Sequence, residues 1–467
     1  MTDYRTEKDT LGEVRVPSNA LWGAQAQRAV ENYPISGLRE HPTFIRSFIY
    51  LKKAAALANK ELKGMDAKLA DAIVAACDEL LKNENHYREQ FVVDVFQAGA
   101  GTSFNMNVNE VIANLANRSL GGKLGEYRPI NPNDHVNMAQ STNDVFPTAI
   151  RVATVLLLEE FWPAIDRLVQ AFDERGNAFA DVIKSGRTHL QDAVPVTLGQ
   201  EFKAYAAAVR RGTRLLRESA NELESLAIGG TATGTGINTP RGYRFAVVKH
   251  LNEMTKLDFK SMDDLREGMQ SQLAVSATSG ALRNLALELT RITNDLRLLA
   301  SGPQTGLAEI ILPAVQPGSS IMPGKVNPSM LECMNQVLFH VIGSDTAIAY
   351  ATQAGQLELN VMMPLMAFEI LFSIEILKNF LPVFVDKCIR GIEADRKRCE
   401  AYYVSSPSLA TALNPLIGYA RAAEIAKESA KSGTPIPQLL REKKLLSEEE
   451  IARIFTPEFL AGQADRA

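Results

Sequence analysis

The sequence predicts a mainly α-helical fold built around an elongated central helical bundle. Apolar residues recur at spacings of three, four and seven over several long stretches, which places them on one face of a helix. Glycine and proline residues stand at the ends of these stretches, where helices commonly stop. Strand and helix patterns do not alternate along the chain, so a doubly wound parallel sheet is not expected.

The clearest helical pattern begins at Leu198. One face of it carries the large apolar residues Phe202, Tyr205, Val209, Leu216 and Leu223, and basic residues fall between them. Similar patterns predict four more long helices, over residues 145–179, 264–299, 329–351 and 363–388. Long helices that follow one another in this way favour a bundle in which their apolar faces pack together.

The pattern changes towards both ends of the chain, which suggests three domains. Residues 1–143 mix short helices with irregular polar runs and form the expected N-terminal domain. Residues 144–394 form the helical bundle, and residues 395–467 form a small C-terminal helical domain. No internal repeat or low-complexity segment interrupts this order.

The composition favours a small-molecule partner in the cytoplasm. Charged residues make up 22% of the 467 residues and the net charge is −4, so a polybasic nucleic-acid surface is not expected. The longest apolar stretch, from Val361, contains Glu369, Glu375 and Lys378, which indicates a buried helix and not a membrane span. The polar N-terminus lacks the apolar core of a signal peptide, and the four cysteines form no CxxC pair. We therefore expect no membrane, no nucleic acid and free thiols.

Four segments are rich in small, hydroxyl and amide residues and break the helical pattern. They cover residues 99–107, 131–144, 186–192 and 317–328. Each of them alone could be a turn or a helix cap, because Ser, Thr, Asn and Asp are favoured there. The fourth combines glycines, serines, prolines and Lys325 in a loop before a long helix, and such loops often carry chemistry.

Together the four segments could bind a dicarboxylate without a metal. Hydroxyl and amide side chains, backbone N–H groups and one lysine all donate hydrogen bonds to carboxylates. An elimination beside a carboxylate builds extra negative charge on it, which preorganised donors would stabilise. A serine could act as the base only if Lys325 and nearby N–H groups stabilised its alkoxide. The six histidines show no metal-ligand spacing, so neither a metal nor another cofactor is expected.

Residues 229–236 form a glycine-rich segment that resembles a nucleotide-binding loop. The pattern places it after a helix and not after a strand, so a dinucleotide site is not expected. The sequence assigns no function to this segment.

The segment Gly318–Pro328, with the sequence GSSIMPGKVNP, is similar to the signature of the fumarase/aspartase superfamily. The resemblance extends from Glu7 to about Ser447. It implies a central helical bundle flanked by two smaller domains, and a homotetramer with a multi-helix core in which each active site combines segments of three subunits. It also implies a lyase that acts on a small dicarboxylate.

Two branches of the superfamily compete. The sequences GAGTS at residues 99–103 and STN at residues 141–143 resemble the aspartases, which implies reversible elimination of ammonia from L-aspartate to give fumarate. The sequences LWGAQ at residues 21–25 and NDVFP at residues 143–147 resemble the class II fumarases, which interconvert L-malate and fumarate. We favour the ammonia-lyase and keep the fumarase as the alternative. A scaffold that has become a structural protein, like a lens crystallin, is disfavoured because the loop keeps its serine, lysine and asparagine.

The resemblance implies a role for each candidate residue. Ser319 would be the general base, with His189 and Lys325 as further catalytic residues. Substrate carboxylates would be bound by Lys325, Asn327, Thr102 and Ser320, and the end that bears the amine would be bound by Ser141, Thr142, Asn143, Thr188 and His189. The loop that carries Ser319 would close over the substrate.

Overall fold

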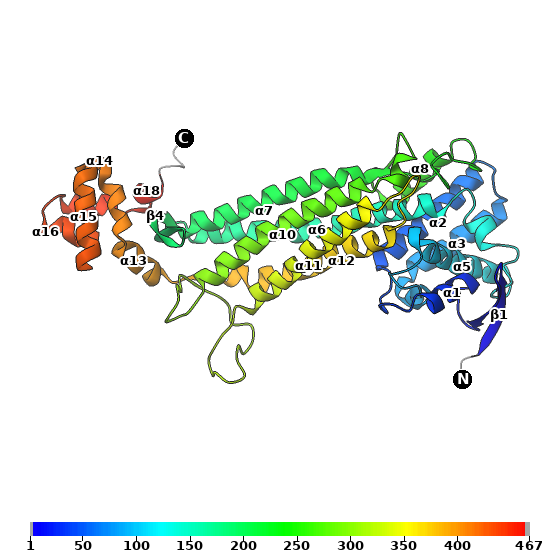
Figure 1. Cartoon of the computed structure of the whole chain (residues 1–467), viewed down its shortest axis with the longest axis horizontal. Coiled ribbons are helices and arrows are strands. Elements are labelled where there is room, and N and C mark those ends of the chain that lie inside the picture. The colour runs from blue at the N-terminus through cyan, green and yellow to red at the C-terminus, as the bar shows by residue number, and fades with distance from the viewer. Residues whose placement is uncertain (1–2, 463–467) are drawn as a thin grey trace. The chain divides into compact units, whose positions relative to one another are not determined.

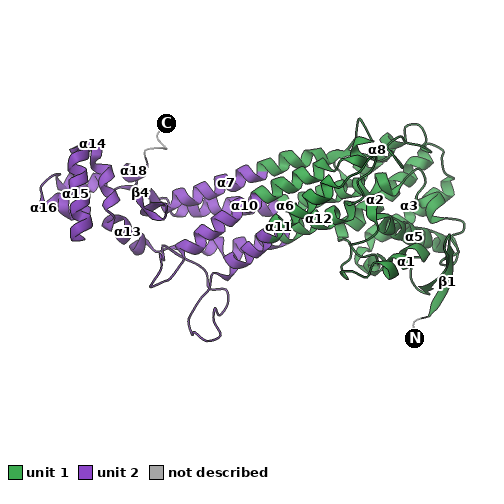
Figure 2. Ribbon diagram, in the orientation of Figure 1, with its two compact units in different colours: residues 1–162, 214–284, 340–376 green, residues 163–213, 285–339, 377–467 purple. Residues whose placement is uncertain are grey.

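The computed structural model describes residues 3–462 and is mainly helical (Figure 1). The described residues also form four two-stranded sheets. The predicted helical fold is therefore confirmed. The chain divides into two compact units, each assembled from three segments (Figure 2). Unit 1 comprises residues 1–162, 214–284 and 340–376, and unit 2 comprises residues 163–213, 285–339 and 377–467. The two units group residues that are close in space, whereas the three predicted domains are consecutive segments of the chain. The units therefore do not test the three domains, which stay a prediction.

Five long helices each contribute residues to both units. They are α6 (Thr142–Ala178), α7 (Leu198–Ala220), α10 (Leu273–Leu299), α11 (Ser329–Gln353) and α12 (Met363–Lys387). Four of them lie close to their predicted bounds. The helix predicted over residues 264–299 starts later than expected, so its predicted start at Asp264 was wrong. A short helix, α9 (Glu267–Gln270), ends before Ser271, whose backbone is extended, and α10 begins only at Leu273.

The apolar face predicted from Leu198 onwards is buried. Phe202, Val209 and Leu216 are fully covered, and Tyr205 is buried beside them. Within unit 2, the ring of Phe172 on α6 lies 6.2 Å from that of Phe202 and 5.9 Å from that of Tyr205. These aromatic contacts hold α6 against α7.

The rest of unit 1 consists of short strands and helices. These are β1 (Tyr4–Asp9), β2 (Gly12–Pro17), α1 (Ala24–Asn32), α2 (Pro42–Glu61), α3 (Ala67–Lys82), α4 (Glu84–Tyr87), α5 (Thr102–Ser119), β5 (Ser225–Leu226), α8 (Tyr243–Thr255) and β6 (Lys260–Ser261). Strands β1 and β2 form an antiparallel hairpin, and β5 pairs with β6 in parallel. Helix α2 packs against α3 and α8, and the rings of Phe44 and Phe48 on α2 pack against Phe104 on α5.

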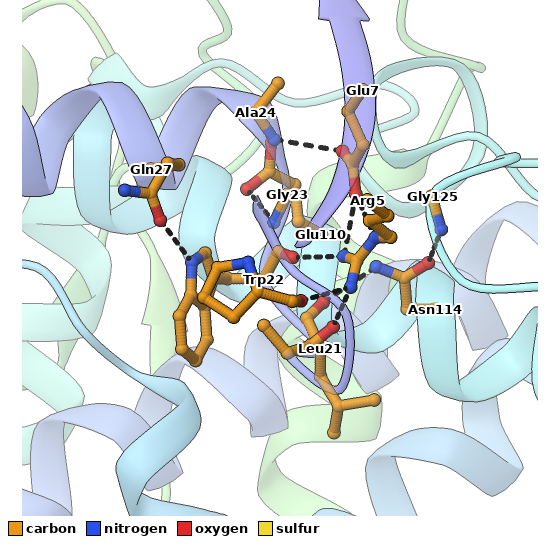
Figure 3. A network of polar contacts seen from close by, with 12 residues as sticks. Arg5, Glu7, Leu21, Trp22, Gly23, Ala24, Gln27, Glu110, Asn114 and Gly125 are labelled. Carbon is orange, nitrogen blue, oxygen red and sulfur yellow. Dashed lines mark hydrogen bonds and ion pairs between the residues drawn. The ribbon is translucent and has the colours of Figure 1, made fainter. Parts of the chain in front are cut away.

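Two buried carboxylates join the N-terminal hairpin to the helices of unit 1 (Figure 3). Glu110 on α5 accepts hydrogen bonds from the N–H groups of Gly23, Gln25 and Ala26 at the start of α1, and Glu7 on β1 accepts from Ala24. The first N–H groups of a helix have no partner within the helix, so these two carboxylates satisfy them. Burial raises the pKa of Glu110 to about 7, against the opposing effect of its three N–H donors.

The remainder of unit 2 is a hairpin, a small sheet and a group of short helices. The elements are β3 (Ile183–Thr188), β4 (Gln191–Thr197), β7 (Ile310–Ile311), β8 (Glu393–Ala394), α13 (Arg396–Ser405), α14 (Asn414–Ile417), α15 (Tyr419–Ser432), α16 (Ile436–Glu442), α17 (Glu448–Ile454) and α18 (Pro457–Leu460). The short helices share a core of their own that includes Leu413, Ile425 and Leu440. Among residues 3–462, no helix is both long enough and apolar enough to cross a membrane.

Candidate functional site

The ten candidate residues fall into two groups. Unit 1 carries Thr102, Ser141, Thr142 and Asn143, and unit 2 carries Thr188, His189, Ser319, Ser320, Lys325 and Asn327. All ten residues lie in turns or loops, or at the adjoining ends of helices or strands.

Thr102 is the first residue of α5 and its side chain is exposed. The preceding turn needs glycine, because Gly101 has a φ of +84° and an added Cβ would lie 1.9 Å from the ring of Phe146. The N–H of Ala100 donates to the carbonyl of Val361 at 2.8 Å, which fixes the turn from the other side. The glycines of this segment thus set where Thr102 stands.

A buried polar network in unit 1 includes Thr142. Asn105 donates through Nδ2 to Thr142 Oγ1 at 3.0 Å and to Asn137 Oδ1 at 3.3 Å. The Lys52 ammonium, fully buried on α2, donates to Asn137 Oδ1 at 3.0 Å and to Gln140 Oε1 at 2.9 Å. Sequence reasoning missed Lys52; its place among the apolar and alanine residues of α2 was the available sign that it is buried.

Ser141 and Asp144 form a reciprocal cap at the start of α6. The N–H of Asn143 donates to Ser141 Oγ at 3.2 Å, and the N–H of Ser141 donates to Asp144 Oδ1 at 2.9 Å. The helix-cap interpretation of this segment therefore holds for Ser141. Its hydroxyl still has a hydrogen to donate, so the cap does not exclude a second role.

We expect Lys52→Met to remove a pH dependence from the stability of the fold. Burial lowers the pKa of Lys52 from 10.5 to about 7, although the Asp144 carboxylate opposes the shift. Between these two values the unfolded chain binds more protons than the folded chain, so stability rises with pH across that window. Urea midpoints measured from about pH 7 to about pH 10 should show this rise in the unaltered protein and not in Lys52→Met. In Lys53→Met, which alters the neighbouring lysine paired with Asp78, the rise should persist; its loss there as well would contradict the assignment to Lys52.

In unit 2, Thr188 and His189 stand at the exposed tip of the β3–β4 hairpin. His189 and Leu190 form the two-residue turn and have φ angles of +55° and +59°. Such turns favour Asn and Gly, because most side chains are strained at positive φ. Strained backbone conformations cluster at functional segments, so this exposed turn is consistent with a functional role.

Charged side chains anchor the base of this hairpin. Glu309 is fully buried and accepts from Arg187 Nη1 at 2.9 Å through both of its oxygens, and it lies 3.1 Å from Lys184 Nζ. Lys184 also donates to Glu201 Oε1 at 2.8 Å, and burial raises the pKa of Glu201. Paired in this way, the buried charges are compensated and fix the strand that ends at Thr188.

The segment that carries Ser319 and Lys325 is an exposed loop whose ends meet. A Cβ on Gly318 would lie 2.2 Å from the carbonyl oxygen of Lys325, and Asn327 Nδ2 donates to the carbonyl of Gly318. Ser319 Oγ accepts from the N–H groups of Ile321 at 3.2 Å and Met322 at 2.9 Å. These are the N–H donors that a serine alkoxide would need.

The geometry supplies donors for carboxylates but no group of metal ligands. In residues 3–462, no set of three or more His, Cys, Asp and Glu side chains could hold a metal ion. Within that range, no hydrogen bond or ion pair joins the hairpin tip, Thr188 and His189, to the loop of Ser319. Asn327 donates to Gly318 and so joins the two ends of the loop, which form its narrow neck. Ser320 and Lys325 are exposed.

Comparison with known proteins gives matches over nearly the whole chain. The family model described as Lyase matches residues 12–343, and the model described as Fumarase C C-terminus matches residues 409–462. The chain is 47% identical over 455 residues to the aspartate ammonia-lyase of Bacillus subtilis (strain 168), which covers 97% of this chain and 95% of that protein. It is 44% identical over 467 residues to the aspartate ammonia-lyase of Escherichia coli (strain K12). That match covers 100% of this chain and 98% of that protein.

Two solved structures are similar to this fold. The cobalt-bound fumarate lyase:delta crystallin from Brucella melitensis has a TM-score of 0.93 and 47% identity, covering 97% of this chain and 98% of that chain. The recombinant class II fumarase from Schistosoma mansoni has a TM-score of 0.92 and 34% identity. That match covers 98% of this chain and 99% of that chain. The fold is shared equally with both, whereas the sequence is closer to the first.

Proposed function

The chain belongs to the fumarase/aspartase superfamily, and from that premise we propose that it is an aspartate ammonia-lyase, a carbon–nitrogen lyase that reversibly converts L-aspartate into fumarate and ammonia. The observation that carries the choice is sequence identity over the full length, which is higher to two aspartate ammonia-lyases than to a class II fumarase. The fold alone does not separate the two activities, because both kinds of relative share it.

Ser319 is the proposed general base. Its Oγ takes the proton from the carbon next to the side-chain carboxylate, the electrons form the carbon–carbon double bond, and ammonia leaves from the neighbouring carbon. The N–H groups of Ile321 and Met322 already point at Ser319 Oγ and support the serine in its deprotonated form. Lys325, on the same loop, adds a positive charge.

The remaining candidates divide between the two ends of the substrate. Lys325, Asn327, Thr102 and Ser320 bind the carboxylates, where donors that strengthen with the developing charge lower the barrier. The end that bears the amine is bound by Ser141, Thr142, Asn143, Thr188 and His189. The narrow neck at Gly318 supports a loop that moves as one piece to close the site.

The proposed enzyme is a cytoplasmic homotetramer with no nucleic-acid or membrane partner and no resident cofactor. Its partner is a small dicarboxylate. Each active site takes the unit 1 group, the hairpin tip and the Ser319 loop from different subunits.

A steady-state assay tests this function. We expect the purified protein to produce fumarate from L-aspartate without any added cofactor, followed by the absorbance of fumarate. L-Malate at the same concentration should give slower production. Faster turnover of L-malate would identify a fumarase, and no turnover of either substrate would contradict both enzymatic functions.

A further inference from the structure

The glycine-rich loop at residues 229–236 lies against the start of α6, beside candidate residues of the site. It follows strand β5, a two-residue element, and not a helix directly. Two residues of α6 hold it, and these residues are Asn143 and Asp144. The loop therefore contacts the segment proposed to bind the amine end of the substrate.

Asp144 joins the loop to the helix cap through backbone groups alone. Its Oδ2 accepts from the N–H groups of Gly229 and Thr231, each at 2.9 Å, and its Oδ1 accepts from Ser141. Asp144 is fully buried. Burial raises its pKa to about 6, against these three donors, so the carboxylate is charged at neutral pH.

The backbone of the loop is strained where Asp144 holds it. Thr231 is buried and has a φ of +55°, which is unfavourable for a β-branched residue. Gly229 has a φ of +92°, and a Cβ there would lie 2.8 Å from the Cβ of Arg244. Gly229, Gly234 and Gly236 of the loop also line a cavity of 530 Å³. The two hydrogen bonds from Asp144 therefore lie at the strained part of the loop, between Gly229 and Thr231.

The contact with Asn143 fixes which way its amide points. Asn143 Nδ2 donates to the carbonyl oxygen of Ala232 at 2.8 Å. A carbonyl oxygen can only accept, so the NH₂ group must face Ala232 and the Oδ1 atom is left for another donor. An ammonium group offers three donors and no acceptor, whereas a carboxylate offers only acceptors. In this orientation Asn143 favours an amine over a carboxylate.

We propose that the glycine-rich loop is a specificity element that holds the Asn143 amide oxygen ready for the substrate amine, with Asp144 as the positioning residue that anchors the loop. The inference rests on the proposed function, because it assumes that Asn143 contacts substrate. It adds a role for a loop and a carboxylate that do not themselves touch the substrate.

Asp144→Asn tests the proposal in the full-length protein. The substitution keeps the shape of the side chain but replaces one accepting oxygen with NH₂, so it cannot serve Ser141, Gly229 and Thr231 together. We expect the KM for L-aspartate to rise about tenfold, the scale of one lost hydrogen bond to a charged group, while the inhibition constant of succinate changes less than about twofold. Succinate is the probe because it has both carboxylates and no amine.

Backbone hydrogen exchange and a matched control complete the test. The peptide that spans residues 226–233 should exchange faster in Asp144→Asn. Asp258→Asn removes a carboxylate from an exposed position of the same unit and should change neither exchange nor KM. Equal weakening of aspartate and succinate, or faster exchange with an unchanged KM, would overturn the proposal.

Gly229→Ala provides a second variant if Asp144→Asn does not fold. It keeps the carboxylate but forces the loop to shift, because the added Cβ would approach Arg244 too closely. The same separation between aspartate and succinate is expected, and its absence would overturn the proposal. Failure of the unaltered protein to convert L-aspartate would instead refute the proposed function, before any variant is compared.

Discussion

Ser319→Ala should lower the turnover of L-aspartate at least about a hundredfold, the usual scale for the loss of a positioned general base. Ser319 Oγ already accepts two backbone N–H groups, which would stabilise the alkoxide that abstracts the proton. Alanine removes that oxygen and leaves the rest of the loop unchanged. The measurement is kcat from the rate of fumarate formation, at saturating L-aspartate.

A hydroxyl that accepts from the next N–H groups is also a common turn-forming contact, so stability must be measured alongside activity. Because the donors of Ile321 and Met322 belong to exposed residues, water can replace Ser319 Oγ, and the melting temperature should change little. Ser320→Ala is the matched comparison: the same deletion one residue along should raise KM and largely preserve kcat. Near-normal kcat in Ser319→Ala would exclude Ser319 as the base.

The long helices could be predicted from sequence because their apolar spacing is local information. The face that runs from Leu198 through Phe202 and Leu216 is buried as expected. The break between α9 and α10 was missed, because apolar residues continue through Ser271 with helical spacing while the backbone there is extended. A pattern of side chains does not report a local change of backbone conformation.

The polar segments at residues 186–192 and 317–328 could also be singled out from sequence, since their small polar residues contrast with the helices, but the β3–β4 hairpin was not predicted. The buried groups that support the unit 1 candidates could not be found in this way. Lys52 reaches Asn137 across 85 positions of the chain, and Asp144 reaches Gly229 across another 85. The glycine-rich loop had no visible purpose in sequence, because its partners on α6 are close only in the folded chain. Buried polar partners of this kind depend on tertiary contacts, which spacing along the chain does not encode.

Mixing two inactive variants should restore activity if each active site draws on several subunits. Thr188 and Ser319 both lie in unit 2, yet no described hydrogen bond or ion pair joins the hairpin tip to the loop. We therefore expect one site to take Thr188 from one chain and Ser319 from another. Thr188→Ala and Ser319→Ala, each inactive alone, are unfolded, mixed in equal amounts and refolded, so that subunits reassort within a closed symmetric tetramer.

Random reassortment fixes the size of the recovery. Half of the hairpins and half of the loops are unaltered, so about a quarter of the sites receive both segments intact when they come from different chains. Activity should return to about a quarter of that of refolded unaltered protein, while each variant refolded alone stays inactive. If both segments came from one chain, every site would carry one lesion and no activity would return. Native mass spectrometry establishes whether tetramers with mixed subunits have formed, so mixed tetramers without activity would refute a site shared between subunits.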